Sequence, residues 1–202
     1  MVDIAARERE KYERMAALEQ YKKSFGLNFV DDAMTAFKPM AGDTLWDFGC
    51  GTGLCVKWFR DRGILAKGID ITPARLIDEA RDGFVESPLW ELDGILQATW
   101  GFCSDVMEHI PPEKVDDVLS GIFNKTQRGA YFTISTVSDK CGKLIGETLH
   151  LTVQPAEWWE AKLGERWENV IFRGDYGSGG VFLCLNGLES TNSRGAENIT
   201  PL

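Results

Sequence analysis

A glycine-rich loop between two short apolar runs constrains the fold of this chain more than any other feature. The first run ends at Asp47, and glycine then stands at every second position as Gly49, Gly51 and Gly53. Glycine lets the backbone turn sharply and approach a ligand closely, because it has no Cβ atom. A dinucleotide fingerprint would place its third glycine one position later, where this chain has leucine. The loop therefore suits a single nucleoside-like ligand better than a pyrophosphate.

A second carboxylate follows one predicted helix later, where another apolar run ends in Gly68-Ile69-Asp70. Strands that alternate with helices form a parallel sheet, and ligands bind beyond the carboxyl ends of such strands. Asp47 and Asp70 each stand at the end of a predicted strand. Both carboxylates are therefore expected at the same edge of the sheet, beside the glycine loop.

Apolar periodicity and the positions of glycine and proline delimit the remaining elements. Strands alternating with helices predict an α/β fold with a mostly parallel sheet, and the last two strands predict an antiparallel hairpin. The expected strands are 44–47, 66–71, 84–86, 99–104, 130–135, 169–172 and 181–185. The expected helices are 4–25, 54–62, 72–83, 111–123 and 155–163.

The length of 202 residues fits one domain with a full core. We expect this domain to cover residues 1–185, with a helical segment over residues 1–40. Residues 186–202 are polar and lack an apolar pattern, which predicts a flexible tail.

Charge and composition limit the functions that are open to the chain. Its 22 Lys and Arg residues stand against 31 Asp and Glu residues, so the net charge is −9 and a polyanion is repelled at long range. No apolar stretch is long enough to span a bilayer, and the charged N-terminus lacks the apolar core of a signal peptide. The five cysteines are scattered, which argues against a disulfide framework or a zinc knuckle. We predict a cytoplasmic protein without a membrane partner.

Two motifs together resemble a known family. Asp47-x-Gly49-x-Gly51-x-Gly53 followed by Asp70 resembles the S-adenosylmethionine (SAM) loop of class I, or seven-β-strand, SAM-dependent methyltransferases. The segment 102–111, Phe-Cys-Ser-Asp-Val-Met-Glu-His-Ile-Pro, is similar to the fourth-strand motif of that family. The resemblance covers roughly residues 40–185 by element order. It implies a Rossmann-like doubly wound sheet of about seven strands, SAM as cofactor, and an N-terminal lid over residues 1–40.

The same resemblance assigns cofactor contacts along the chain. The loop residues would line the methionine portion of SAM, and the carboxylate that ends the second strand would accept hydrogen bonds from the ribose hydroxyls. The residue after it and the backbone at the end of the third strand would contact adenine, and the end of the fourth strand would lie beside the sulfonium. The expected cofactor-binding residues are Asp47, Gly49, Cys50, Gly51, Gly53, Asp70, Ile71, Leu89, Ser104 and Asp105.

Glu108, His109 and His150 are the candidate catalytic residues. Imidazole titrates near neutral pH, so His109 can serve as a general base for a hydroxyl acceptor. His150 lies in the long loop after the predicted fifth strand, a loop that faces the acceptor in similar methyltransferases. Both histidines are therefore expected to converge on the reaction centre. The alternative is that Glu108 is structural and His109 packs against the cofactor.

A second alternative takes Asp105, Glu108, His109 and His150 as ligands of a divalent ion. Small-RNA 3′-end 2′-O-methyltransferases and some ubiquinone-pathway O-methyltransferases show a related acidic-x-x-Glu-His arrangement. Relatives without a metal also share the motif, so the predicted site contains no metal.

The predicted function is methyl transfer from SAM to oxygen or nitrogen of a small molecule, by a monomer or homodimer. The sequence lacks the Asp-Pro-Pro-aromatic tetrad and the Pro-Cys pair of the two common DNA-base chemistries. Two alternatives stay open. One is a nucleic-acid methyltransferase, acting on ribose 2′-O or tRNA, with Lys140, Lys143, Arg173 and Arg194 as candidate contacts. The other is a SAM-binding subunit without turnover.

Overall fold

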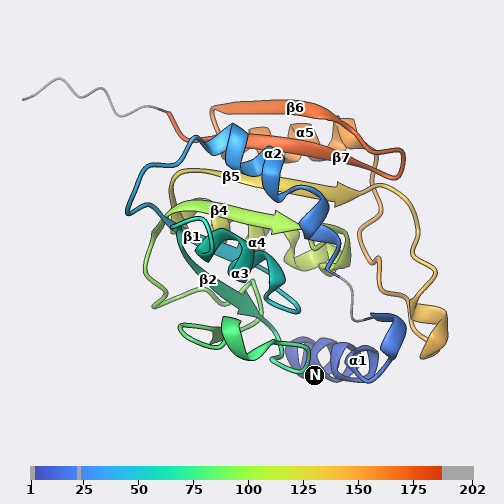
Figure 1. The fold of residues 1–202 in the computed structure, drawn as a ribbon. Coiled ribbons are helices and arrows are strands. Elements are labelled where there is room, and N and C mark those ends of the chain that lie inside the picture. The colour runs from blue at the N-terminus through green and yellow to red at the C-terminus, as the bar shows by residue number, and fades with distance from the viewer. Residues whose placement is uncertain (1–2, 22–23, 188–202) are drawn as a thin grey trace, which may run out of the picture.

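A seven-stranded sheet forms the centre of the computed structural model, which describes residues 3–21 and 24–187 (Figure 1). The strand order is β3-β2-β1-β4-β5-β7-β6, and β7 is antiparallel to both of its neighbours while the other pairings are parallel. The predicted α/β sheet with an antiparallel C-terminal hairpin is therefore confirmed. The strands are β1 (Thr44–Phe48), β2 (Leu65–Asp70), β3 (Val85–Glu86), β4 (Ala98–Ser104), β5 (Thr126–Ser135), β6 (Asn169–Asp175) and β7 (Gly179–Leu185).

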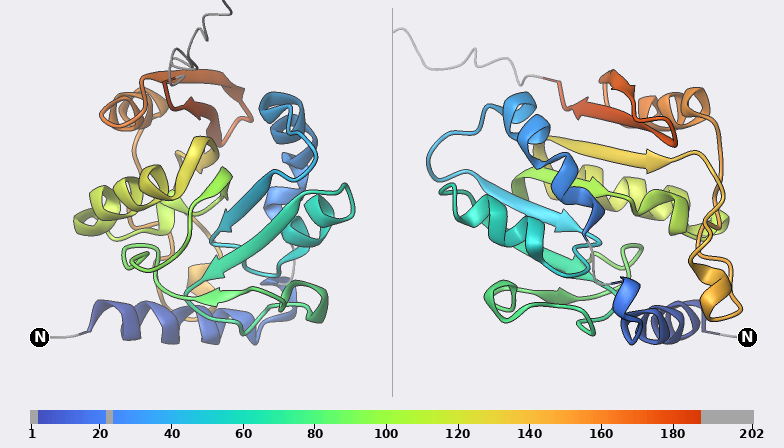
Figure 2. Two further views of the ribbon diagram at one scale, coloured as in Figure 1. Left: turned by 90° about the vertical axis from the view of Figure 1, so that its left-hand side faces the viewer. Right: turned by 45° about the vertical axis from the view of Figure 1, so that its right-hand side comes forward.

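Helices cover both faces of this sheet, as the turned views show (Figure 2). One face carries α2 and α3 and the other carries α4 and α5, while α1 lies across the end of the sheet near β3. The α-helices are α1 (Ile4–Ala16), α2 (Val30–Phe37), α3 (Leu54–Arg60), α4 (Val115–Lys125) and α5 (Ala156–Gly164). Short 3-10 helices are η1 (Glu19–Tyr21), η2 (Phe25–Asn28), η3 (Asp78–Ala80), η4 (Met107–His109), η5 (Pro112–Lys114) and η6 (Gly142–Leu144).

Two apolar clusters, one on each face, fix these layers. Phe37 of α2 and Phe59 of α3 belong to one cluster, whereas Leu119 of α4 and Trp159 of α5 belong to the other. All four side chains are at most 2% exposed. Burial of large apolar side chains is the dominant favourable term in folding, so the sheet is held in place from both sides.

The predicted helix over residues 72–83 is wrong. Ile77 has an extended backbone, and its N–H donates to the carbonyl of Thr52 at 3.0 Å. This bond ties the segment to the glycine loop, so only the 3-10 turn η3 follows β2. The predicted helix over 4–25 is also too long, because α1 ends at Ala16.

Asn186, the first residue of the predicted tail, is bonded to β5. Its backbone N–H donates to the carbonyl of Arg128 at 3.0 Å. Its side-chain amide donates to the carbonyls of Thr126 and Gln127. The rest of the predicted flexible tail, from residue 188, lies outside the described residues. Within the described part of the chain, every helix is too short or too polar to cross a bilayer.

Candidate functional site

The glycine loop leaves the carboxyl end of β1 and is bonded to β2. The backbone N–H groups of Gly49 and Cys50 both donate to the carbonyl of Ile69, at 2.8 and 3.0 Å. Gly49 has a φ of 77°, and a Cβ atom there would lie 2.5 Å from Cγ2 of Val106. Any side chain would therefore be strained and would collide with the segment that follows β4, so glycine is required at this position.

Two adjoining cavities open around this loop. The expected cofactor residues that line the first cavity are Gly49, Gly51, Asp70, Ile71, Leu89 and Asp105. Those that line the second cavity are Asp47, Gly49, Cys50, Gly51, Ser104 and Asp105. The structure thus brings all of the expected cofactor residues except Gly53 to the two cavities.

Gly53 has a different place in the fold. It is the N-cap residue of α3 with a φ of 73°, and a Cβ atom there would lie 2.3 Å from that of Ala80. Its backbone therefore packs against η3, and it lines neither cavity. The absence of a side chain at Gly53 permits the close approach of α3 and η3.

Asp70 connects the loop to the first cavity. Its Oδ2 atom accepts from the N–H of Gly51 at 2.8 Å, and Oδ1 accepts from the N–H of Thr72 at 3.2 Å. Burial raises the pKa of this carboxyl, although the two backbone donors oppose the shift. The carboxylate is consequently fixed in orientation before any ligand arrives.

Asp47 lies deeper and is only 3% exposed. Burial, reinforced by the charge of Asp70, raises the pKa of Asp47 to about 8. In the structure as it stands, this carboxyl therefore retains a proton at neutral pH. A cationic group placed in the second cavity would favour its ionised form.

The carboxyl end of β4 is hydrogen-bonded to β5. The hydroxyls of Ser104 and Thr133 lie 2.6 Å apart, and the N–H of Asp105 donates to the carbonyl of Thr133 at 2.9 Å. Asp105 has the left-handed φ of 59°, which is uncommon outside glycine and which directs the chain away from the sheet. Its carboxylate lines both cavities.

Glu108 is completely buried behind this turn. Its Oε1 atom accepts from the N–H of Ser135 at 2.9 Å, and its carboxyl group lies within hydrogen-bonding reach of the carboxyl group of Asp105. Burial and the neighbouring carboxylate of Asp105 raise the pKa of Glu108. Glu108 lines neither cavity.

His109 and His150 meet as expected, with ring centroids 4.6 Å apart and ring planes at 86°. Nδ1 of His109 lies 3.2 Å from the carbonyl oxygen of Leu149, and Nδ1 of His150 lies 2.6 Å from that of Val137. A carbonyl oxygen only accepts, so each Nδ1 atom carries a proton, and in the neutral ring of His109 the lone pair is then on Nε2. Burial lowers the pKa of His109 to about 3, so this ring is neutral at physiological pH. His109 lines the first cavity and His150 lines neither cavity.

The same three residues could hold a metal ion. Potential ligand atoms of Glu108, His109 and His150 lie within 4.8 Å of one another. Two imidazoles and a carboxylate suit several divalent transition metals, and histidine ligands usually donate their other N–H to a carbonyl or carboxylate. Asp105, the fourth ligand of the metal alternative, is not part of this group.

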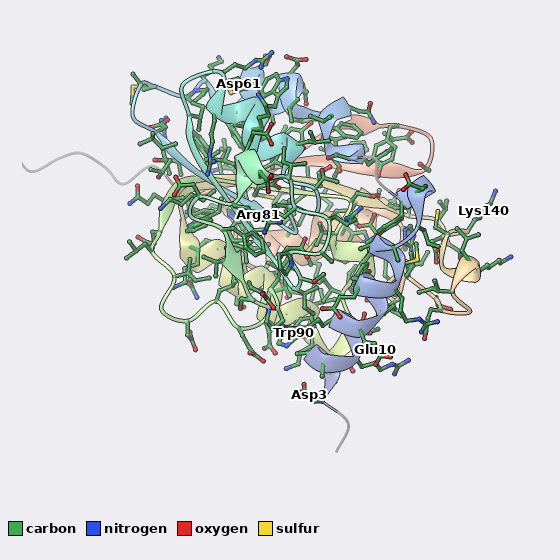
Figure 3. The ribbon with its side chains drawn as sticks, turned by 60° about the horizontal axis from the view of Figure 1, so that its bottom comes forward. Asp3, Glu10, Asp61, Arg81, Trp90 and Lys140 are labelled. Carbon is green, nitrogen blue, oxygen red and sulfur yellow. The ribbon has the colours of Figure 1, made fainter. Side chains whose placement is uncertain are left out.

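Several residues that line the cavities were not identified from the sequence. Tyr12 of α1 contacts His109 edge to face at 5.9 Å between ring centroids, and it lines the first cavity with Glu8. Tyr21 and Arg75 line both cavities. Tyr12 and Tyr21 fit the apolar spacing of a helix that packs on the domain. Only the family resemblance, through the expected N-terminal lid, placed this segment near the cofactor. The helix α1 lies along the side of the molecule that carries Trp90 of the first cavity (Figure 3).

Several solved structures of methyltransferases are similar in fold to this chain. A magnesium protoporphyrin IX methyltransferase from Synechocystis PCC 6803, with bound S-adenosylhomocysteine (SAH), is 16% identical with a TM-score of 0.62, over 92% of this chain and 88% of that one. The N-methyltransferase NodS from Bradyrhizobium japonicum WM9 is 11% identical with a TM-score of 0.63, over 92% and 100% of the two chains. A 1,6-didemethyltoxoflavin-N1-methyltransferase from Burkholderia thailandensis is 13% identical in sequence. The match has a TM-score of 0.61 and covers 92% of this chain and 91% of that one.

No family model and no curated protein matches the chain at the sequence level. The likeness to these proteins is therefore one of fold. The chain has the seven-stranded, Rossmann-like fold of the class I SAM-dependent methyltransferases.

Proposed function

We propose that this protein is an enzyme that transfers a methyl group from SAM to oxygen or nitrogen of a small molecule. The observation that carries the proposal is the pair of adjoining cavities around Asp70 and the glycine loop. A nucleoside joined to an amino acid needs two connected compartments of this kind. The structural neighbours named above were crystallised with SAH or act on small acceptors, which supports the same cofactor and acceptor class.

The adenosine part of SAM would occupy the first cavity, and its methionine part the second. Asp70 would accept hydrogen bonds from the ribose hydroxyls, while Ile71 and Leu89 would lie against adenine. Asp47, Gly49, Cys50 and Gly51 would surround the methionine chain, and Ser104 and Asp105 would lie beside the sulfonium. Gly53 would act indirectly, through the position of α3.

Methyl transfer is an in-line displacement. The bond from sulfur to methyl breaks with its electron pair going to sulfur, and a lone pair of the acceptor forms the new bond. Positioning alone can supply several kcal/mol of barrier reduction, because the methyl of a sulfonium is already electrophilic. A base is needed only to accept the proton that the acceptor loses.

We propose that His109 contacts the acceptor through its unprotonated Nε2 atom. A pKa near 3 makes this imidazole a weak base, so its main contribution is to accept a hydrogen bond from the acceptor and orient it. His150 packs against His109 and would support that orientation or extend the contact. Glu108 lines neither cavity, so it acts as a positioning residue through the backbone of Ser135.

A metal-assisted form of the same reaction is the second candidate. The grouping of ligand atoms from Glu108, His109 and His150 within 4.8 Å of one another favours it. Glu108, His109 and His150 would hold the ion, which when bound would polarise an acceptor oxygen. The three residues fit such an ion in number and in donor type.

Nucleic acid is the less favourable acceptor. Of the cations proposed for it, Arg173 of β6 is already ion-paired with Asp32, and Arg194 lies outside the described residues. The net charge of −9 opposes a polyanion at long range. A cytoplasmic location and a monomeric or homodimeric state stay predictions.

Calorimetry with SAM and SAH tests the proposal most directly. We expect binding of both, and transfer of labelled methyl from SAM to members of a panel of hydroxyl and amine metabolites. Absence of binding to either ligand would contradict the proposed function. Binding without transfer to any small molecule or tRNA would favour a subunit without turnover.

A further inference from the structure

Arg75 is the single arginine or lysine among the described residues that line the two cavities. It lies in the segment between β2 and η3 and borders both cavities at once. The remaining charged groups along these walls are acidic, and they are Glu8, Asp47, Asp70 and Asp105. The positive charge is therefore placed at one point, where the two cavities meet.

The guanidinium group is held in place by Tyr21 and Gly51. Its Nη1 atom donates to the carbonyl of Tyr21 at 2.8 Å, and the group lies 4.4 Å from the centre of the Tyr21 ring. A Cβ atom at Gly51 would lie only 2.5 Å from Nη2. The charged end of Arg75 thus lies directly against the backbone of the glycine loop.

Most of the donors on this group have no partner among the described residues. A guanidinium carries five N–H donors, and one of them is used by the carbonyl of Tyr21. None of the described carboxylates is within ion-pair distance of Arg75. Burial raises the pKa values of Asp70 and Asp105, and the charge of Arg75 is near enough to oppose that rise. A half-buried guanidinium with free donors is suited to a carboxylate, which it binds through two parallel hydrogen bonds.

We propose that Arg75 binds the α-carboxylate of the methionine part of SAM. This inference rests on the proposed function and deepens it. The ammonium and sulfonium of SAM match the acidic side chains of the cavities, whereas its carboxylate matches only Arg75. A ribose held by Asp70 would direct the methionine chain across Gly51, which is the residue that the guanidinium touches. That placement favours the carboxylate of the cofactor over one on the acceptor.

Binding of two ligands to matched variants tests the inference. The ligands are SAH and its decarboxylated analogue, measured by calorimetry on the full chain. Arg75→Met keeps the length of the side chain and removes its charge. We expect the Kd for SAH to rise about tenfold or more, because a hydrogen-bonded charge pair is lost, and the Kd for the decarboxylated analogue to stay within about twofold. Arg75→Lys keeps the charge without the bidentate geometry. Its Kd for SAH should lie between those of the parent protein and Arg75→Met.

Arg81→Met is the matched control. Arg81 lies on the same segment, is exposed, and pairs with Asp78 at the surface (Figure 3). This variant should bind both ligands as the parent protein does. The parent protein itself should bind SAH at least tenfold more tightly than the decarboxylated analogue, a comparison that does not depend on any variant folding.

Equal weakening of both ligands in Arg75→Met would overturn the inference, and so would equal affinity of the parent protein for the two. In either case SAH still binds, so the proposed function stands while Arg75 loses its assignment. If the parent protein binds neither SAH nor SAM, the proposed function fails and the inference fails with it.

Discussion

The carboxylate of Asp70 accepts a hydrogen bond from the N–H of Gly51 at 2.8 Å. This contact joins the end of β2 to the glycine loop that follows β1. It is the point at which the two acidic strand ends and the loop become one site.

Asp70→Ala should weaken SAH binding by about 2 kcal/mol, which corresponds to a factor of roughly 30 in Kd. Two hydrogen bonds to the ribose would be lost, and the N–H of Gly51 would lose its acceptor. Calorimetry measures the change. Asp78→Ala removes a carboxylate that is 95% exposed on the neighbouring turn, and it should leave the affinity unchanged. Similar affinities of the two variants for SAH would show that Asp70 does not contribute to binding.

Binding of SAH should become tighter as the pH rises from 6 to 8. The pKa of Asp47 is raised to about 8 in the structure, and an ammonium beside it would favour the ionised form. Binding therefore releases a proton in this window, and raising the pH favours release. Calorimetry in buffers of different ionisation enthalpy measures how many protons are released when SAH binds. Asp47→Asn should flatten the pH profile, and an unchanged slope in that variant would assign the proton to another group.

The same carboxyl affects the stability of the protein in the opposite direction. Its pKa is raised above the usual value of about 3.9 for an unfolded chain. The folded state therefore binds more protons between pH 4 and pH 8, so this contribution to stability is full at low pH and is lost as pH rises through 8. Thermal unfolding of the ligand-free protein and of Asp47→Asn should differ most at the alkaline end of that range. A constant difference from pH 5 to pH 9 would contradict the assigned pKa.

Gly49→Ala should destabilise the protein more than Gly63→Ala. Both glycines have positive φ, at 77° and 83°, so both substitutions carry a backbone strain of about 1 kcal/mol. Only Gly49 faces an obstacle, since a Cβ atom there lies 2.5 Å from Val106 while nothing lies within 4 Å at Gly63. The collision should add about 1–3 kcal/mol. Denaturant unfolding measures both variants, and equal losses would mean that Val106 moves away freely.

Addition of Mn²⁺ or Co²⁺ tests the metal-assisted alternative. If Glu108, His109 and His150 hold an ion, saturating metal should raise the thermal midpoint of the parent protein, because a ligand bound only by the folded state stabilises it. Glu108→Gln preserves an acceptor for the N–H of Ser135 and should lose this rise. Glu113→Gln, on the exposed surface, is the matched control. A midpoint that no divalent ion changes would leave the imidazoles as the only groups acting on the acceptor.

Local patterns in the sequence were sufficient to predict the sheet, and most of the residues expected to bind the cofactor line the two cavities. The strands appeared as short apolar runs with glycine or proline at their ends, and the carboxylates appeared where those runs stop. The helix expected over residues 72–83 was wrong. Thr72 is a good N-cap residue and Pro73 suits the first turn of a helix, but a hydrogen bond to a distant segment prevents the helix. The N–H of Ile77 is bonded to Thr52 of the glycine loop, which no local pattern contains.

The sequence by itself determined the alternation of strands and helices and the acidic residues at the ends of β1 and β2. Apolar periodicity and turn residues are local signals between neighbouring positions, so they can be recognised from the sequence alone. Only the tertiary structure decided that Tyr12 faces His109, that Gly53 packs on Ala80 away from the cavities, and that Arg75 lies against Gly51. These are contacts between segments far apart in the chain, and they arise from how the loops and α1 close over the end of the sheet.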